Sequence, residues 1–153
     1  MFETLRKPGG YRVDYLNPSS GHREGAVGLY VCGVLNDGEP YSRDAKRRLY
    51  AGLLALRSRP EMGELVAVYV DVLPHPRAER PAFRQMMADL QSGLIRKVVL
   101  AERREDVQCS PDYQRLLQYQ RETGRAGVVA FEGEALLDFP RFTSCGRPAS
   151  LGV

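Results

Sequence analysis

The chain has 153 residues, of which 43% are hydrophobic and 27% are charged, and its formal net charge is +3. This composition is that of an ordinary globular domain with one core, and the small positive charge permits contact with nucleic acid without implying it. The three cysteines form no CxxC pair and no zinc spacing, which argues against a secreted disulfide scaffold. Because residues 1–10 lack a signal peptide and apolar runs are only strand-sized, we expect a cytoplasmic protein without a membrane span.

The first part of the chain predicts an extension, a strand and a helix. Residues 1–25 are rich in turn formers, and the alternating segment Tyr11–Tyr15 within them indicates a short edge strand or an ordered arm. The continuous apolar run Ala26–Cys32 predicts a strand that is buried on both faces. Ser42 is then expected to cap a helix that continues to about Arg57.

The middle of the chain repeats this alternation. Leu65–Val70 predicts a second buried strand, and an irregular loop is expected over residues 72–79. A second helix is predicted to begin at Pro81, where a missing N–H costs nothing, and to end at Gly93. Val98–Ala101 predicts a third strand.

The last part of the chain predicts one more helix and strand. The helix is expected to begin after Ser110 and to end at Gly124, and Gly127–Phe131 predicts the fourth strand. Residues 133–153 are interpreted as a loosely ordered tail, in which only Ala135–Phe139 is apolar.

Strands that alternate with helices of about a dozen residues define βαβ units. Such units bring consecutive strands into a parallel sheet with helices on both faces. We therefore predict an α/β domain of three layers, α/β/α, with a mostly parallel sheet over residues 26–132.

Short sequence motifs lie at or next to the ends of these predicted strands and helices. They are Tyr30-Val31-Cys32-Gly33-Val34, Tyr69-Val70-Asp71, Arg80-Pro81, Gly93, Lys97-Val98-Val99 and Glu105-Asp106-Val107-Gln108-Cys109-Ser110. In this order and spacing, residues 27–132 resemble the catalytic domain of resolvase/invertase-type serine recombinases. The resemblance implies a flavodoxin-like strand order and, as the family's activity, site-specific DNA recombination by a serine nucleophile.

The same resemblance marks residues at which the family's chemistry is missing. Val34 stands at the nucleophile position, and valine has neither a hydroxyl nor a thiol. Cys32, Asp106 and Cys109 stand where the family has arginines, which bind phosphate in a fork. Since the loss of one such donor costs about 10²–10³ in rate, we expect a catalytically inactive pseudoenzyme.

Two charged residues of the family's site are retained, Asp71 and Arg80. One interpretation is an ion pair that holds the loop of residues 72–79 against the site. The other is a residual anion site around Arg80.

The resemblance also brings Cys32 and Cys109 to one rim of the sheet, where doubly wound folds bind ligands. They are interpreted either as small semi-buried hydrophobic residues or as a redox or soft-metal pair. Neither a metal site nor a cofactor is predicted.

Basic residues gather at the start of the first long helix, at Arg43, Lys46, Arg47 and Arg48. They form either a stripe that contacts DNA phosphates or a solvated helix face.

The function predicted from these features is that of an interaction or regulatory module linked to DNA recombination. Its expected partners are DNA or a recombinase-like subunit. A homo-oligomer, in which the partner is a second copy of the chain, is a further option. The alternatives are an active or fragmentary resolvase, and a small-molecule or thiol-redox role in the altered cleft.

Overall fold

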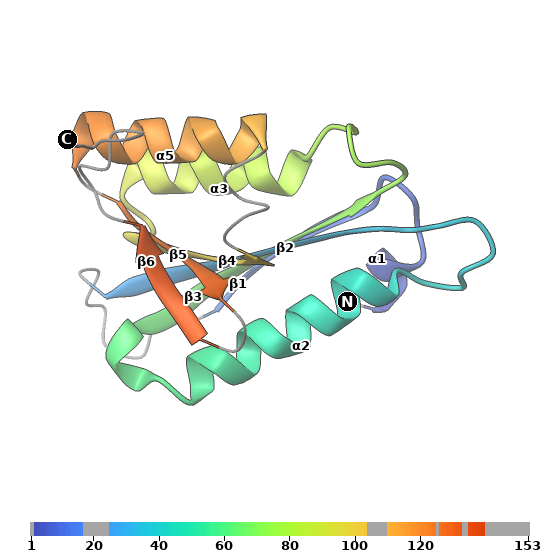
Figure 1. Ribbon diagram of the computed structural model, residues 1–153, viewed down its shortest axis with the longest axis horizontal. Helices are drawn as coiled ribbons and strands as arrows, with labels where there is room; N and C mark the ends of the chain where they lie inside the picture. The colour runs from blue at the N-terminus through green and yellow to red at the C-terminus, as the bar shows by residue number, and fades with distance from the viewer. Residues whose placement is uncertain (1, 17–24, 104–109, 125, 133–134, 140–153) are drawn as a thin grey trace.

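The computed structural model describes residues 2–16, 25–103, 110–124, 126–132 and 135–139 (Figure 1). Within them the elements follow in the order α1 (Phe2–Leu5), β1 (Tyr11–Tyr15), β2 (Ala26–Val34), α2 (Arg43–Arg57), the 3-10 turn η1 (Pro60–Met62), β3 (Glu64–Leu73), α3 (Pro81–Ser92), β4 (Lys97–Arg103), α5 (Pro111–Thr123), β5 (Gly127–Glu132) and β6 (Ala135–Phe139).

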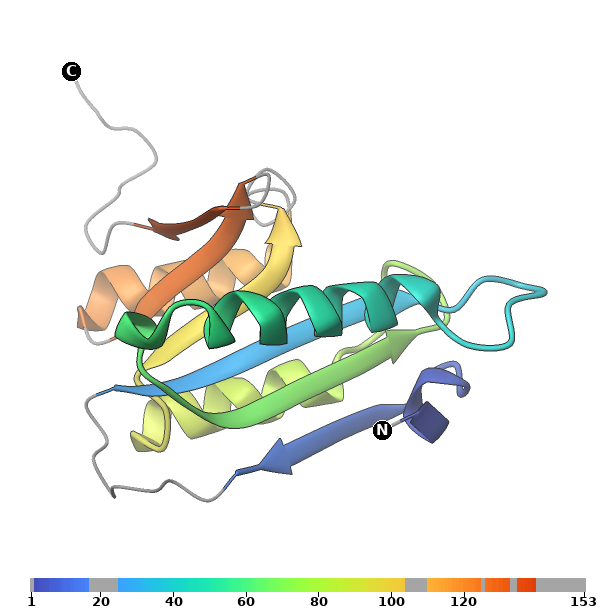
Figure 2. The ribbon, with the colours of Figure 1, turned by 90° about the horizontal axis from the view of Figure 1, so that it is seen from below.

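The described strands form one sheet with the order β1-β3-β2-β4-β5-β6 (Figure 2). The four central strands are parallel, whereas β1 pairs antiparallel with β3 and β6 pairs antiparallel with β5. The four parallel strands β2, β3, β4 and β5 are the first to fourth parallel strands along the chain. Across the sheet they lie in the order β3-β2-β4-β5, that is 2-1-3-4, which is the flavodoxin-like arrangement. The predicted fold class is therefore confirmed.

The helices cover both faces of the sheet and complete the three layers. Helix α2 lies on one face, and α3 and α5 lie on the other (Figure 1). The short helix α1 lies on the α2 side, where the backbone N–H of Ser42 donates to the carbonyl of Leu5 at 2.8 Å. None of the described helices combines the length and the apolar character needed to cross a bilayer.

Strand β2 explains why both faces of the sheet are apolar. Successive side chains of a strand point to opposite faces. Tyr30 and Cys32 belong to the core beneath α3 and α5, whereas Leu29 and Val31 belong to the core beneath α2. A continuous apolar run is thus what a central parallel strand requires.

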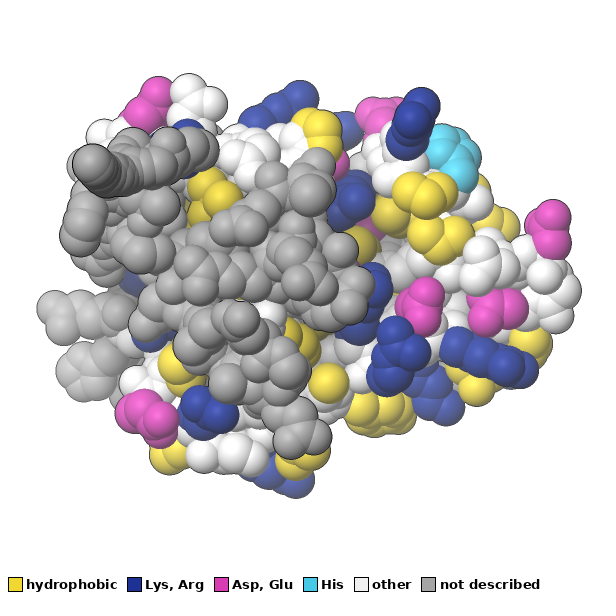
Figure 3. All heavy atoms as spheres, viewed as in Figure 1, with side chains coloured by type: hydrophobic (Ala, Val, Ile, Leu, Met, Phe, Trp, Pro, Cys, Tyr) yellow, Lys and Arg dark blue, Asp and Glu magenta, His cyan; other side chains and the backbone are white. Residues whose placement is uncertain are grey.

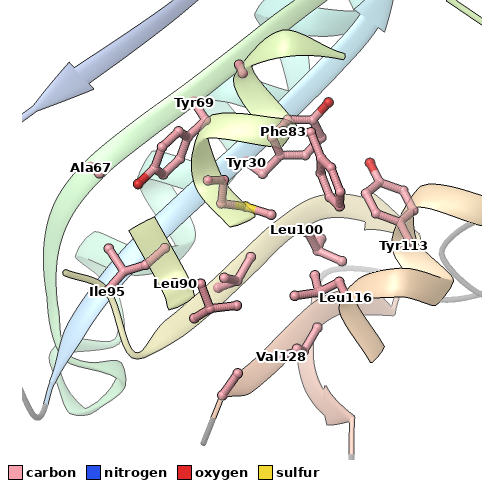
Figure 4. Close-up of a cluster of buried hydrophobic side chains, with 14 of the residues drawn as sticks. Tyr30, Ala67, Tyr69, Phe83, Leu90, Ile95, Leu100, Tyr113, Leu116 and Val128 are labelled. Carbon is pink, nitrogen blue, oxygen red and sulfur yellow. The ribbon is translucent and has the colours of Figure 1, made fainter. Parts of the chain in front are cut away.

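The core beneath α3 and α5 has an aromatic centre (Figure 4). The rings of Tyr30, Phe83 and Tyr113 meet edge to face, with centroids 5.2–6.1 Å apart. Met86 of α3 and Leu116 of α5 are fully buried beside them. This packing fixes where α3 and α5 begin, next to the carboxyl ends of β2 and β3.

The predicted helix ends are confirmed. The Ser42 hydroxyl accepts from the Ala45 N–H at the start of α2, and Gly93 and Gly124 end α3 and α5 with left-handed φ values of 86° and 63°. The positive φ is the reason for glycine at both ends.

Two segments differ from the sequence prediction, and a third takes one of its two predicted forms. Strand β3 continues through Val72 and Leu73, which were predicted as the start of a loop, because these two residues pair with the end of β2. The segment Tyr11–Tyr15 is an edge strand, one of its two predicted forms. Ala135–Phe139 is a strand that pairs with β5, so the prediction of a loosely ordered tail is wrong for these residues.

Candidate functional site

The candidate site lies at the carboxyl ends of β2, β3 and β4, where α3 and α5 begin. In the parallel sheet Cys32 of β2 is paired in register with Asp71 of β3. Arg80 immediately precedes α3, and Glu102 lies near the end of β4. The structure therefore brings together Cys32, Asp71 and Arg80, three of the residues that the sequence marked.

Cys32 is the centre of this cluster and is only 5% exposed. Its sulfur accepts from Nη1 of Arg80 at 3.4 Å, and its thiol lies 3.6 Å from Oε2 of Glu102 and 3.6 Å from the Tyr113 hydroxyl. Burial raises the pKa of the Cys32 thiol to about 11, although the nearby Arg80 opposes this shift. The thiol is thus protonated at neutral pH, in the form that is a poor nucleophile.

Glu102 has hydrogen-bonding partners on both of its carboxylate oxygens. Oε1 forms an ion pair with Nη2 of Arg48 at 3.3 Å, and Oε2 accepts from the Tyr113 hydroxyl at 3.1 Å. Nη1 of Arg48 also donates to the carbonyl of Cys32 at 2.8 Å. A buried carboxylate needs such partners, and here they join α2, β4 and α5.

Arg80 is held by α5 and not by Asp71. Its Nε lies 3.4 Å from Oδ2 of Asp112, and its guanidinium carbon lies 5.3 Å from the centre of the Tyr113 ring. The predicted Asp71–Arg80 ion pair is therefore replaced by an Arg80–Asp112 pair. The reason is that Asp71 is already committed to the backbone of α3.

Asp71 is 1% exposed and acts as a cap for α3 from outside the helix. Its carboxylate accepts from the N–H groups of Ala82 and Phe83 at 2.9 and 3.0 Å and from the Tyr30 hydroxyl at 2.8 Å. Burial raises the pKa of Asp71, and these three donors oppose the shift. An anion at a helix N-terminus is favourable, so Asp71 has a structural role in setting the start of α3.

Val34 ends β2 and is partly exposed. The Ser42 hydroxyl donates to the Val34 carbonyl at 3.0 Å and accepts from the Ala45 N–H at 3.2 Å. Because Ser42 is fully buried and caps α2, its oxygen is not directed at solvent. Its role in this structure is to cap α2.

The basic residues at the start of α2 have local partners. Arg47 forms an ion pair with Asp44 at 3.1 Å, and the Lys46 ammonium lies 5.0 Å from the centre of the Tyr41 ring. Arg43 is exposed. On the described part of the face in Figure 3, Lys and Arg side chains are interspersed with acidic and uncharged ones.

Asp106 and Cys109 lie outside the described residues, so the structure does not place the second half of the predicted cysteine pair. Glu102 was not marked by the sequence, and Arg48 was marked only as one of the basic residues at the start of the first long helix. Glu102 directly follows the predicted strand Val98–Ala101, and a charge at that position is a signal for the carboxyl edge of a sheet. Among the described residues there is no group of three or more potential metal ligands.

No protein-family model matches this chain, and no curated protein is significantly similar to it.

Proposed function

We propose that this chain is a non-catalytic relative of the resolvase catalytic domain and acts as an interaction or regulatory module linked to DNA recombination. The observation that carries the proposal is the state of Cys32. A neutral, buried thiol lies between Arg80 and Glu102, where a DNA-cleaving site needs cationic groups open to a phosphate.

The charge balance of the cluster supports the same proposal. Its two guanidinium groups, Arg48 and Arg80, are each paired with a carboxylate, Glu102 and Asp112. Both arginine side chains are largely buried, at 28% and 13% exposure. Cations that are already paired inside the protein offer little to an incoming phosphate.

The first experiment tests the absence of catalysis. The chain is incubated with a supercoiled plasmid that carries the target site of an active serine recombinase, and covalent protein–DNA adducts are sought on denaturing gels. We expect none with the wild-type chain, whereas the active recombinase gives them. A covalent adduct formed by this chain would show that the non-catalytic assignment is wrong.

An interaction module also needs an exposed apolar surface, and α2 provides one. Tyr50 and Leu54 are 62% and 63% exposed and lie four residues apart, so they share one face of the helix. With Leu53 and Arg57 they line a hollow of about 530 Å³. Aromatic and arginine side chains are enriched at protein interfaces, and we assign this surface to a recombinase-like subunit.

The second experiment measures recombination by an active serine recombinase of the same cell, with and without this chain. We expect its presence to change the recombination frequency about fivefold or more. The double variant Tyr50→Ser/Leu54→Ser should lose the effect. The control variant Tyr11→Ser, which alters a side chain of 57% exposure on β1, should keep it. Equal behaviour of the two variants, or no effect of the wild-type chain, would reject the module.

DNA is the alternative partner, through Arg43, Lys46 and Arg47. Binding of duplex DNA at several salt concentrations tests it, because each lost phosphate contact reduces the salt slope by about 0.9. If Arg43→Gln/Arg47→Gln reduces the slope and Tyr50→Ser/Leu54→Ser has no effect on recombination, DNA replaces the protein subunit as the partner.

A thiol-redox role has less support. Its described cysteine, Cys32, is buried and protonated, and reactive thiols need the opposite environment.

A further inference from the structure

A hollow of about 420 Å³ lies beside the cluster, between the segment that precedes α3 and the start of α5. Its volume falls within the range of small-molecule sites, about 300–1,000 Å³. Phe83 and Met87 of α3 form part of its apolar lining. The charged residues that line it are Arg77, Glu79, Arg80, Arg84, Asp112 and Arg115.

The charges of this hollow do not cancel. Four arginines face two carboxylates, which leaves an excess of two positive charges at neutral pH. The arginines come from three segments, namely the loop before α3, α3 itself and α5. A concave surface with one sign of charge in excess concentrates ions of the opposite sign.

Arg80 and Arg84 differ in how firmly they are held. Arg80 is fixed against Asp112 with a side chain that is 13% exposed. Arg84 pairs with Glu79 at 2.9 Å, but the two side chains are 70% and 86% exposed. Because such an exposed pair contributes little, Arg84 is available to another anion.

Arg77 and Arg115 supply the excess charge. Both are exposed, and within the described part of the chain neither forms an ion pair. Arg115 lies three residues after Asp112 on α5, so both project from the same face of the helix. The guanidinium group of arginine is a planar fork that matches two oxygens of a phosphate.

We propose that this hollow binds a phosphate group through Arg77, Arg115 and Arg84, with Arg80 and Asp112 as its fixed inner wall. The phosphate belongs to a small organic molecule, whose apolar part contacts Met87, or to a nucleic-acid backbone. The site is separate from the sulfur of Cys32, and its existence does not depend on the proposed kinship with recombinases.

Calorimetric titration of the full chain tests the site with four probes: inorganic phosphate, adenosine 5′-monophosphate, adenosine and a short DNA duplex. We expect inorganic phosphate or adenosine 5′-monophosphate to bind saturably with a Kd of about 1 mM or below, and adenosine not to bind. Arg77→Gln/Arg115→Gln should weaken this binding about tenfold or more, because it removes charge-assisted hydrogen bonds.

The matched control is Arg96→Gln/Arg121→Gln, which removes the same charge from exposed residues near the opposite edge of the sheet, before β4 and at the end of α5. It should change the Kd less than about twofold. Saturable binding of the mononucleotide without duplex binding identifies a small molecule as the phosphate's source. Duplex binding alone, with the same dependence on Arg77 and Arg115, identifies nucleic acid. Equal losses in the two double variants, or no saturable binding of any probe, would overturn the site.

Discussion

Cys32 combines a buried sulfur with charged neighbours, and the burial decides its protonation. Burial destabilises the thiolate by more free energy than the attraction of Arg80 stabilises it. The pKa of Cys32 therefore rises from 9.0 to about 11. The protonated thiol then serves as a weak hydrogen-bonding group between Arg80 and Glu102. Cys32 therefore contributes packing and weak hydrogen bonds at the carboxyl ends of the strands, and it does not act as a nucleophile.

The raised pKa predicts an alkaline loss of stability. Since the unfolded chain releases the thiol proton near pH 9.0 and the folded chain releases it near pH 11, the stabilising effect is complete below pH 9.0 and is lost as the pH rises to about 11. The loss should reach about 2–3 kcal/mol. Urea unfolding of the wild-type chain and of Cys32→Ala at both pH values measures it. If both proteins lose the same free energy between these pH values, the assignment to Cys32 is wrong.

At this scale the sequence predicted that three residues of the cluster meet, but it predicted neither the presence of Glu102 nor how the side chains pair. The residues at the ends of the predicted strands were sufficient to predict that Cys32, Asp71 and Arg80 lie together at the carboxyl ends of the strands. The partner of Arg80 could not be predicted, because Asp71 is taken by the backbone N–H groups of Ala82 and Phe83. Such competition between backbone and side-chain donors is decided only by the packed geometry.

Strand β1 is the element whose attachment depends most on single side chains. The Tyr15 hydroxyl donates to Oδ2 of Asp89 at 2.7 Å, and the Tyr69 hydroxyl donates to the same oxygen at 2.7 Å. Gln85 donates to the other oxygen, Oδ1, at 2.9 Å. Asp89 lies on α3 and is buried, so these contacts hold an edge strand against a helix of the neighbouring layer.

Removing the Tyr15 hydroxyl should loosen this strand selectively. We expect Tyr15→Phe to lower the free energy of unfolding by about 0.5–1.5 kcal/mol and to speed hydrogen exchange of the Leu16 N–H, which donates to the Val66 carbonyl. The control is Tyr11→Phe, because Tyr11 lies on the same strand and is 57% exposed. Comparable exchange rates of Leu16 in the two variants would contradict a role for the Tyr15–Asp89 contact.

Elements in the centre of the sheet were more predictable than those at its edges. The central strands are marked by continuous apolar runs and the helices by Ser42, Pro81, Gly93 and Gly124. The strand Ala135–Phe139 carries a weaker signal, because an edge strand needs only one apolar face and its pairing with β5 is a tertiary contact.

At the scale of the whole molecule, the residues that the structure describes form two cores that share a single sheet. Met86 belongs to the core beneath α3 and α5, and Leu49 belongs to the core beneath α2. Alternate residues of β2 contribute to the two cores. The same strand backbone therefore supports both, and one core cannot unfold without disturbing the other. Such an arrangement favours cooperative unfolding of both layers together.

We therefore predict one unfolding transition in urea. Tyrosine near-ultraviolet circular dichroism, which reports on the aromatic core, should coincide with the far-ultraviolet signal of the helices. Met86→Ala and Leu49→Ala should each lower the free energy of unfolding by about 2–5 kcal/mol and shift both signals together. A shift of one signal without the other would mean that the two layers unfold separately.

The antiparallel pairing of β1 with β3 has a consequence for any shortened form of the protein. With residues 1–16 deleted, the outer backbone groups of β3 would lose their partners along a strand that is apolar for most of its length. An uncovered strand of this kind is a template for pairing with other chains. Truncated versions are thus expected to self-associate through β3. In the full chain, β1 covers this strand and so protects the protein from aggregation.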